Sequence, residues 1–160
     1  MPQTTFSKTP GLAYPGMCEG LPIYAPSAIL QAAAGVDAGR ALIAVASTPG
    51  EAQKCDLIGG AGDVPKILGF SILQSYTFEP KSTRFAQKDA ITLLSRGLIW
   101  LTCVDDRSAA IISTAIYIAN TGADLGLPQA SATGGTAHTG IKCLQGGTAG
   151  NLGLFAVNLV

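Results

Sequence analysis

The sequence has little charge, and what it has is balanced. Only 12% of its 160 residues are Asp, Glu, Lys or Arg, and ten basic residues offset ten acidic ones, whereas an average globular protein carries about 25% charged residues. Net charge away from zero keeps proteins apart in solution, so this composition predicts a surface largely covered by further copies of the chain or by a large partner. The basic residues are scattered and form no stripe that could neutralise phosphates, so we expect no nucleic-acid partner.

Long apolar runs are absent as well. The longest plainly apolar stretches, residues 41–46 and 111–119, fall far short of the roughly 20 residues of a membrane helix, so we expect no membrane partner. The first ten residues are polar and lack the apolar core of a signal peptide. The four cysteines are widely spaced and form no CxxC pair, which predicts reduced, free thiols.

Residues that carry enzyme or metal chemistry are scarce. His138 is the one histidine, and it lies in a stretch rich in glycine and threonine. With Cys143 it would supply two ligands of the four that a structural zinc site needs. As a Cys-His nucleophile pair it would lack an orienting group and an oxyanion hole. The Asp105-Asp106 pair is interpreted as a turn at a strand end. We therefore predict no catalytic residue, no metal site and no cofactor, and a protein that is not an enzyme.

Proline and glycine recur through residues 1–26 and exclude a helix there, because proline fixes φ and has no backbone donor. The same segment carries more large apolar side chains than a flexible tail would. It is predicted to be an extended N-terminal arm that lies on its own domain or on a neighbour, followed by a single β domain over residues 27–160. The arm residues predicted to make interface contacts are Tyr14, Pro15, Gly16, Met17, Leu21, Ile23 and Tyr24.

From residue 39 onward the pattern predicts short strands separated by turns, which is typical of an all-β sandwich or barrel. Gly69 is predicted to mark a bulge or a close backbone approach. Residues 27–38 leave two alternatives open, an alanine-rich helix or a strand over residues 28–31. Residues 120–140 are predicted to form a long projecting loop. The expected strands cover residues 40–46, 54–58, 66–75, 115–119, 141–144 and 153–160.

Residues 90–104 contain the most distinctive pattern of the chain. Around Arg96-Gly97 two alternatives remain, a tight hairpin or one long strand with a bulge at Gly97. Beyond it, Leu98 and Trp100 would share one face of a strand with Thr102 and Val104, while Ile99, Leu101 and Cys103 occupy the other face. Both faces are largely apolar, which predicts that the strand lies between two layers and that Trp100 belongs to the core.

Five ordered segments resemble the capsid cement, or decoration, proteins of tailed bacteriophages. They are AYPGM at residues 13–17, AGRALI at 38–43, KILGFS at 66–71, AITLLSRGLIW at 90–100 and the glycine-rich end at 150–160. Together these segments extend over most of the chain. The stretch after the tryptophan strand and residues 120–140 do not match the family pattern.

The resemblance implies an all-β fold, a β-sandwich or jelly-roll-like domain with an extended N-terminal arm. It implies a homo-oligomer, dimer or trimer, made in the bacterial host cytoplasm and bound to the outer capsid surface of the virion. There it would clamp neighbouring copies of the major capsid protein, with the arm residues as capsid or subunit contacts. The alternative is a receptor- or carbohydrate-binding β module of the phage surface, with residues 120–140 as its binding loop.

Overall fold

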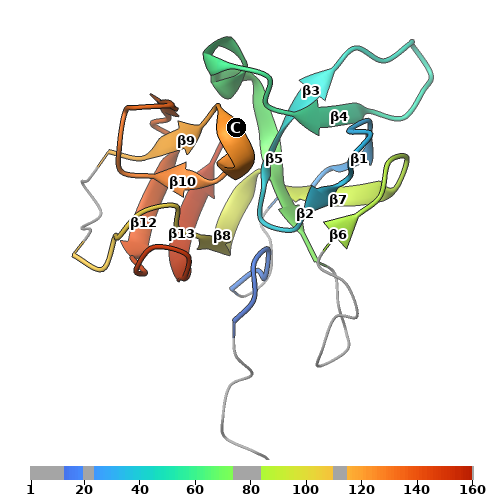
Figure 1. Cartoon of the computed structure of the whole chain (residues 1–160). Helices are drawn as coiled ribbons and strands as arrows, with labels where there is room; N and C mark the ends of the chain where they lie inside the picture. Colours follow the sequence, from blue (N-terminus) through green and yellow to red (C-terminus); the bar gives the residue numbers. More distant parts are fainter. Residues whose placement is uncertain (1–12, 20–23, 74–83, 110–114, 160) are drawn as a thin grey trace, which may run out of the picture.

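The structure is a computed structural model that describes residues 13–19, 24–73, 84–109 and 115–159. Strands dominate this part of the chain, and its helices are two short 3-10 turns, η1 (Ala61–Lys66) and η2 (Gly122–Asp124). The predicted all-β class is confirmed. Neither turn approaches the length of a membrane-spanning helix, and none is found among the described residues. Figure 1 shows two groups of strands that lie next to each other.

Five strands close into a small barrel. Their order is β1 (Ser27–Leu30), β4 (Lys54–Leu57), β3 (Ala41–Val45), β5 (Ile67–Ile72) and β7 (Ala90–Leu94), and β7 returns to β1. Side chains fill the interior, as expected for a barrel with so few strands. The interior residues include Ala28, Leu30, Leu42, Cys55, Ile91 and Leu93.

A second group of strands packs against the barrel. The sheet β12–β13–β8 consists of β12 (Ile141–Gln145), β13 (Leu152–Asn158) and β8 (Arg96–Thr102). Beside it lies the sheet β10–β9–β11, made of β10 (Pro128–Gln129), β9 (Tyr117–Ala119) and β11 (Gly135–Ala137). A two-stranded ribbon joins β2 (Val36–Asp37) to β6 (Arg84–Phe85). The fold therefore differs from a simple β-sandwich, because it consists of a closed barrel, two three-stranded sheets and a two-stranded ribbon in place of two stacked sheets.

The larger hydrophobic core lies between the barrel and these sheets. Alternate residues of β8 and β13 point into it, as the period of two predicts. The barrel contributes from its outer surface, so β3, β5 and β7 are buried on both sides. The core includes Ile43, Phe70, Leu94, Ile99, Leu101, Ile118, Ile141 and Phe155.

The strand after residue 90 passes from one group of strands to the other. β7 pairs with β1 and β5 of the barrel, and β8 pairs with β13, so the hairpin alternative is wrong. The break lies at Ser95 and not at Gly97, which stays in register opposite Val157. Buried Ser95 donates a hydrogen bond from Oγ to the carbonyl of Leu68, which fixes the bend against β5.

The two segments whose patterns were ambiguous or absent both contain strands. Residues 27–30 form β1 despite their alanine content, because β1 closes the barrel between β4 and β7 and tertiary pairing outweighs local propensity. The prediction of a projecting loop over residues 120–140 is wrong, since this segment contains η2, β10 and β11 and wraps around β9. Buried Gln129 and Asn120 hold it through side-chain hydrogen bonds, which stand in for the large apolar residues it lacks.

Gly69 does mark a bulge and a close approach. The register between β3 and β5 shifts beside it, and a Cβ at this position would lie 2.8 Å from Cβ of Leu93 and 2.9 Å from the carbonyl oxygen of Leu94. The missing side chain therefore lets β5 and β7 approach closely inside the barrel.

Candidate interaction surface

The described part of the arm lies along the free edge of β8. The amide of Gly16 donates a hydrogen bond to the carbonyl of Trp100 at 2.8 Å. The amide of Trp100 in turn donates to the carbonyl of Met17 at 2.9 Å. Farther along, the amide of Tyr24 donates to the carbonyl of Arg96 at 3.2 Å. The arm thus extends the β12–β13–β8 sheet by one irregular strand and satisfies backbone groups that an edge strand would otherwise expose.

Tyr14 to Met17 form a tight turn at the start of this segment. Pro15 and Gly16 occupy its centre, Gly16 has φ +79°, and the Met17 amide donates to the Tyr14 carbonyl at 3.1 Å. Proline followed by a residue with positive φ is the signature of a type II turn. Gly16 is buried at the point where the arm meets the barrel. Its neighbours there are Ala38, Gly39 and Ser71.

Alternate arm residues face opposite sides of the sheet. Cys18 bridges to Ile99 and packs against the core, and its burial raises the pKa of its thiol to about 11. The thiol therefore stays protonated at neutral pH and packs as a small apolar group. Met17 and Glu19, on either side of it, lie on the opposite, outer face.

The arm residues predicted as contacts have different positions. Tyr14, Pro15 and Met17 are half-buried, Gly16 is buried and Tyr24 is exposed. Leu21 and Ile23 lie outside the described residues, so their role stays a prediction, as does the boundary of the arm at residue 26.

The outer face of the extended sheet is apolar, and its side chains are partly exposed to solvent. Leu98 and Trp100 of β8 lie opposite Ala156 and Leu154 of β13, and all four are partly exposed. Trp100 is therefore partly exposed, and the prediction that it belongs to the core is wrong. Its Nε1 donates a hydrogen bond to Oε2 of Glu19 at 2.9 Å. We call this surface the outer sheet face. It comprises Met17, Tyr24, Leu98, Trp100, Leu144, Leu154 and Ala156, with Glu19, Arg96, Lys142 and Asn158 among them.

The most exposed large apolar side chains of the described residues both lie on this face. Tyr24 is 53% exposed and Leu144 is 41% exposed. Tyr24 bridges to Arg96 at one edge, and Leu144 occupies the register shift of β12 between Cys143 and Gln145, beside Leu154, at the other. An apolar face rimmed by charged residues is typical of a protein interaction site.

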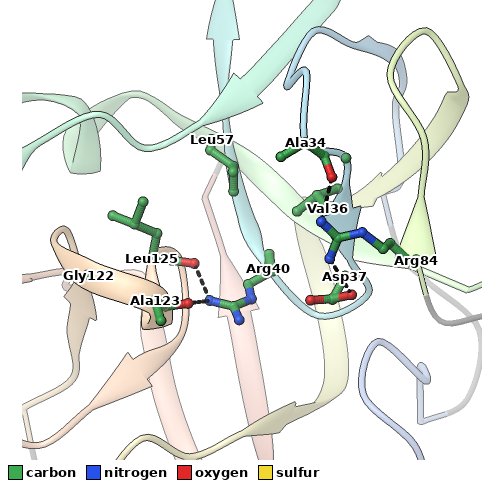
Figure 2. A pocket seen from close by; sticks show the side chains of 10 residues that line it. Ala34, Val36, Asp37, Arg40, Leu57, Arg84, Gly122, Ala123 and Leu125 are labelled. Atoms are coloured by element: carbon green, nitrogen blue, oxygen red, sulfur yellow. Dashed lines mark hydrogen bonds and ion pairs between the residues drawn. The ribbon is translucent and has the colours of Figure 1, made fainter.

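A separate hollow of about 220 Å³ lies beside Arg40 and Arg84 (Figure 2). Nη1 of Arg40 donates to the carbonyls of Ala123 and Leu125 at 3.0 and 2.8 Å, and Arg84 pairs with Asp37 at 3.1 Å. Burial lowers the pKa of Arg40, and nearby Asp37 partly opposes that shift. These bonds tie the segment around η2 to the barrel, which gives Arg40 a structural role.

His138 and Cys143 are not part of a ligand cluster among the described residues. Nδ1 of His138 accepts a hydrogen bond from the amide of Gly140, and Cys143 is buried in the sheet. Across the described residues, no group of three or more His, Cys, Asp or Glu side chains is placed to hold a metal ion.

Sequence reasoning missed much of the outer sheet face. Leu144 and Leu154 had been assigned only to strands, and Glu19 had not been singled out. One signal was present, because the two apolar faces of residues 98–104 predicted a covering layer on each side. Among the described residues, the core covers one face of β8 completely, whereas the side chains on its other face remain partly exposed to solvent.

Comparisons with known proteins found one matching family and, among solved structures, two with related folds. A family model described as structural cement protein (E217 gp24/Pam3 gp6) matches residues 2–158. A chain in the capsid of Myoviridae phage XM1 has a similar fold, with a TM-score of 0.70 and 19% identity over 97% of this chain and 95% of that one. A chain from the head fibre gp8.5 N base of bacteriophage phi29 is more distant, with a TM-score of 0.44 and 13% identity over 85% and 94% of the two chains. No curated protein matches.

Proposed function

Because the chain belongs to the structural cement protein family and is a structural component of a phage capsid, we propose that it binds the outer surface of the icosahedral shell. We propose further that it does so as a homo-oligomer, which clamps neighbouring major capsid subunits. The match of the family model to residues 2–158 carries the proposal. Synthesis in the bacterial host cytoplasm follows from the same proposal.

The outer sheet face is the proposed contact surface of this assembly. Burial of apolar area stabilises a subunit joint by about 25 cal/mol per Å². Since a cement protein acts in many copies, each modest contact is repeated over the shell and stabilises it by mass action. The prolines of the arm and its hydrogen bonds to β8 hold Met17 and Tyr24 in place before binding, which lowers the ordering cost of association.

Placing a charge on this face tests the proposal. We expect Leu144→Asp to weaken binding to capsids assembled without the cement protein by at least about tenfold, because a carboxylate would be buried without a partner. Cosedimentation with such capsids measures the effect. The side chain is 41% exposed in the free chain, so the variant should still fold and its thermal melt should stay near that of the wild type.

Ala52→Asp provides the matched control. Ala52 is exposed between β3 and β4, on the barrel, so the same charge is added away from the outer sheet face. This variant should bind capsids like the wild type. Equal binding by Leu144→Asp and Ala52→Asp would contradict the assignment of the surface.

The alternative of a receptor- or carbohydrate-binding module had depended on a projecting loop over residues 120–140. That segment is folded into the β10–β9–β11 sheet and is partly buried. No specific observation favours this second function.

A further inference from the structure

We propose that the outer sheet face is covered by a second copy of this chain, related by a two-fold axis that runs parallel to the strands. In this arrangement Glu19 of each copy faces Lys142 of the other. The inference rests on the proposed function, since it names the partner that covers the proposed contact surface.

The first observation is a row of side chains that crosses the sheet at one level. The amide of Glu19 donates to the carbonyl of Leu98 at 3.0 Å, Leu98 lies opposite Ala156, and Ala156 lies opposite Lys142. The row therefore has an acid at the arm edge, a base at the β12 edge and two apolar residues between them. Its width is three inter-strand spacings of about 4.8 Å.

The rows on either side continue this pattern. In the next row Met17 and Trp100 lie beside Leu154, which pairs with Gln145 of β12, and Leu144 falls in the register shift next to Gln145. In the preceding row Tyr24 and Arg96 lie beside Asn158. The centre of the face is thus apolar, and the opposite charges of Glu19 and Lys142 stand at opposite edges.

A two-fold axis between β8 and β13 makes this face complementary to itself. The axis turns the arm edge of one copy onto the β12 edge of the other at the same level. Bulky and smaller residues then face each other, and every contact occurs twice, as in any isologous interface. The facing pairs are Glu19 with Lys142, Leu98 with Ala156, Trp100 with Leu154, Met17 with Gln145 and the adjacent Leu144, and Arg96 with Asn158.

The two charged residues are available for this contact. Both side chains are exposed, and Glu19 is held in position by the bond from Trp100 Nε1 to Oε2, which leaves Oε1 open. Lys142 makes no hydrogen bond or ion pair among the described residues. Facing sheets pack about 10 Å apart, a distance that a glutamate and a lysine side chain bridge together. If the major capsid protein covered this face, the acid at one edge would not need to match the base at the other edge of the same face.

Charge exchange in the full-length chain tests the pairing without capsids. Sedimentation equilibrium should find a wild-type dimer, and Glu19→Lys or Lys142→Glu alone should raise its dissociation constant at least tenfold. The double variant Glu19→Lys/Lys142→Glu should recover most of the wild-type affinity. Ala52→Lys, on the barrel, should leave the constant unchanged. Glu19→Gln should weaken the dimer while keeping an acceptor for Trp100, which separates loss of charge from loss of that bond.

Trp100 is the one tryptophan of the sequence and reports directly on the face. Its emission should shift to shorter wavelength as the protein concentration rises through the dissociation constant. A monomer at all concentrations, a trimer, or a dimer insensitive to all charge changes would overturn the inference. If the chain is monomeric but Leu144→Asp still loses capsid binding, the shell itself covers the face, and binding to the shell stands without the homo-oligomer. If the dimer forms as described but Leu144→Asp, which lies in the dimer contact, binds capsids normally, the proposal that the homo-oligomer clamps the shell fails instead.

Discussion

Gly16→Ala is expected to lower the free energy of unfolding by about 2–4 kcal/mol, through backbone strain and overpacking together. At φ +79° an alanine is strained by about 1–2 kcal/mol. Its Cβ would also lie 2.9 Å from both Cβ of Ala38 and the carbonyl oxygen of Ser71. Ala38 lies in the turn before β3 and Ser71 in β5. Both are buried and have little freedom to move, so the arm must shift away.

Thermal unfolding measures the total effect of Gly16→Ala, and hydrogen exchange locates it. In a chain of this size each kcal/mol lowers Tm by roughly 2–4 °C. The amide of Trp100 should exchange faster, since its acceptor is the carbonyl of Met17 directly after the turn. Loss of the arm would also open the edge of β8 and remove Met17 from the outer sheet face.

Gly50→Ala is the control for the strain alone. Gly50 has φ +91°, but a Cβ there would have no atom within 4 Å. It should cost only about 1–2 kcal/mol, the backbone part of the effect. If Gly16→Ala costs no more than Gly50→Ala, the arm is not held by the packing of Gly16.

Asp105→Asn is expected to destabilise the fold by about 2–3 kcal/mol, because it leaves a buried guanidinium without its counter-charge. Only 1% of the Arg107 side chain is exposed, and its Nε lies 3.5 Å from Oδ1 of Asp105. One further bond joins Nη2 to the carbonyl of Ala115 at 3.3 Å, while Nε and Nη1 make no hydrogen bond. We place the effect at or below the low end of the range of about 3–5 kcal/mol for buried pairs, because Asp105 is 31% exposed.

Two further variants separate the charge from other roles of Asp105. Asp105→Asn keeps a side-chain oxygen for the amides of Ala130 and Ser131, which the aspartate now binds through Oδ2. Asp106→Asn makes the same change at the exposed neighbour and should cost much less, because water screens an exposed charge. Adding Arg107→Met to Asp105→Asn should recover most of the loss, since apolar replacement of a buried ion pair is often neutral or stabilising. Urea unfolding measures all three, and no recovery in the double variant would contradict the explanation.

Local patterns predicted the strands well and the connections poorly. The alternation over residues 98–104 and 153–159 matches the buried and exposed sides of β8 and β13. Gly69 does permit a close approach, as its place in the strand pattern predicted. Residues 120–140 failed because their strands are short and their packing uses small residues and side-chain amides, which leave no apolar period.

The candidate surface depends on contacts between distant segments. Leu144 is exposed beside Leu154 because of a register shift in β12. Glu19 and Lys142 share one row only because the arm, β8, β13 and β12 pair in that order. Each segment alone is compatible with several partners, so its neighbours cannot be derived from its own pattern.

By itself, the sequence determined that this chain is an all-β protein with a charge-poor surface, a proline-rich arm and a strand at residues 98–104 that is apolar on both faces. Those properties follow from composition and from the period of two, which any strand expresses locally. Only the tertiary structure decided that the arm lies on the edge of β8, that Trp100 faces outward, and that one apolar face remains half open. Strand order and register arise from long-range pairing and core packing, which local sequence patterns do not specify.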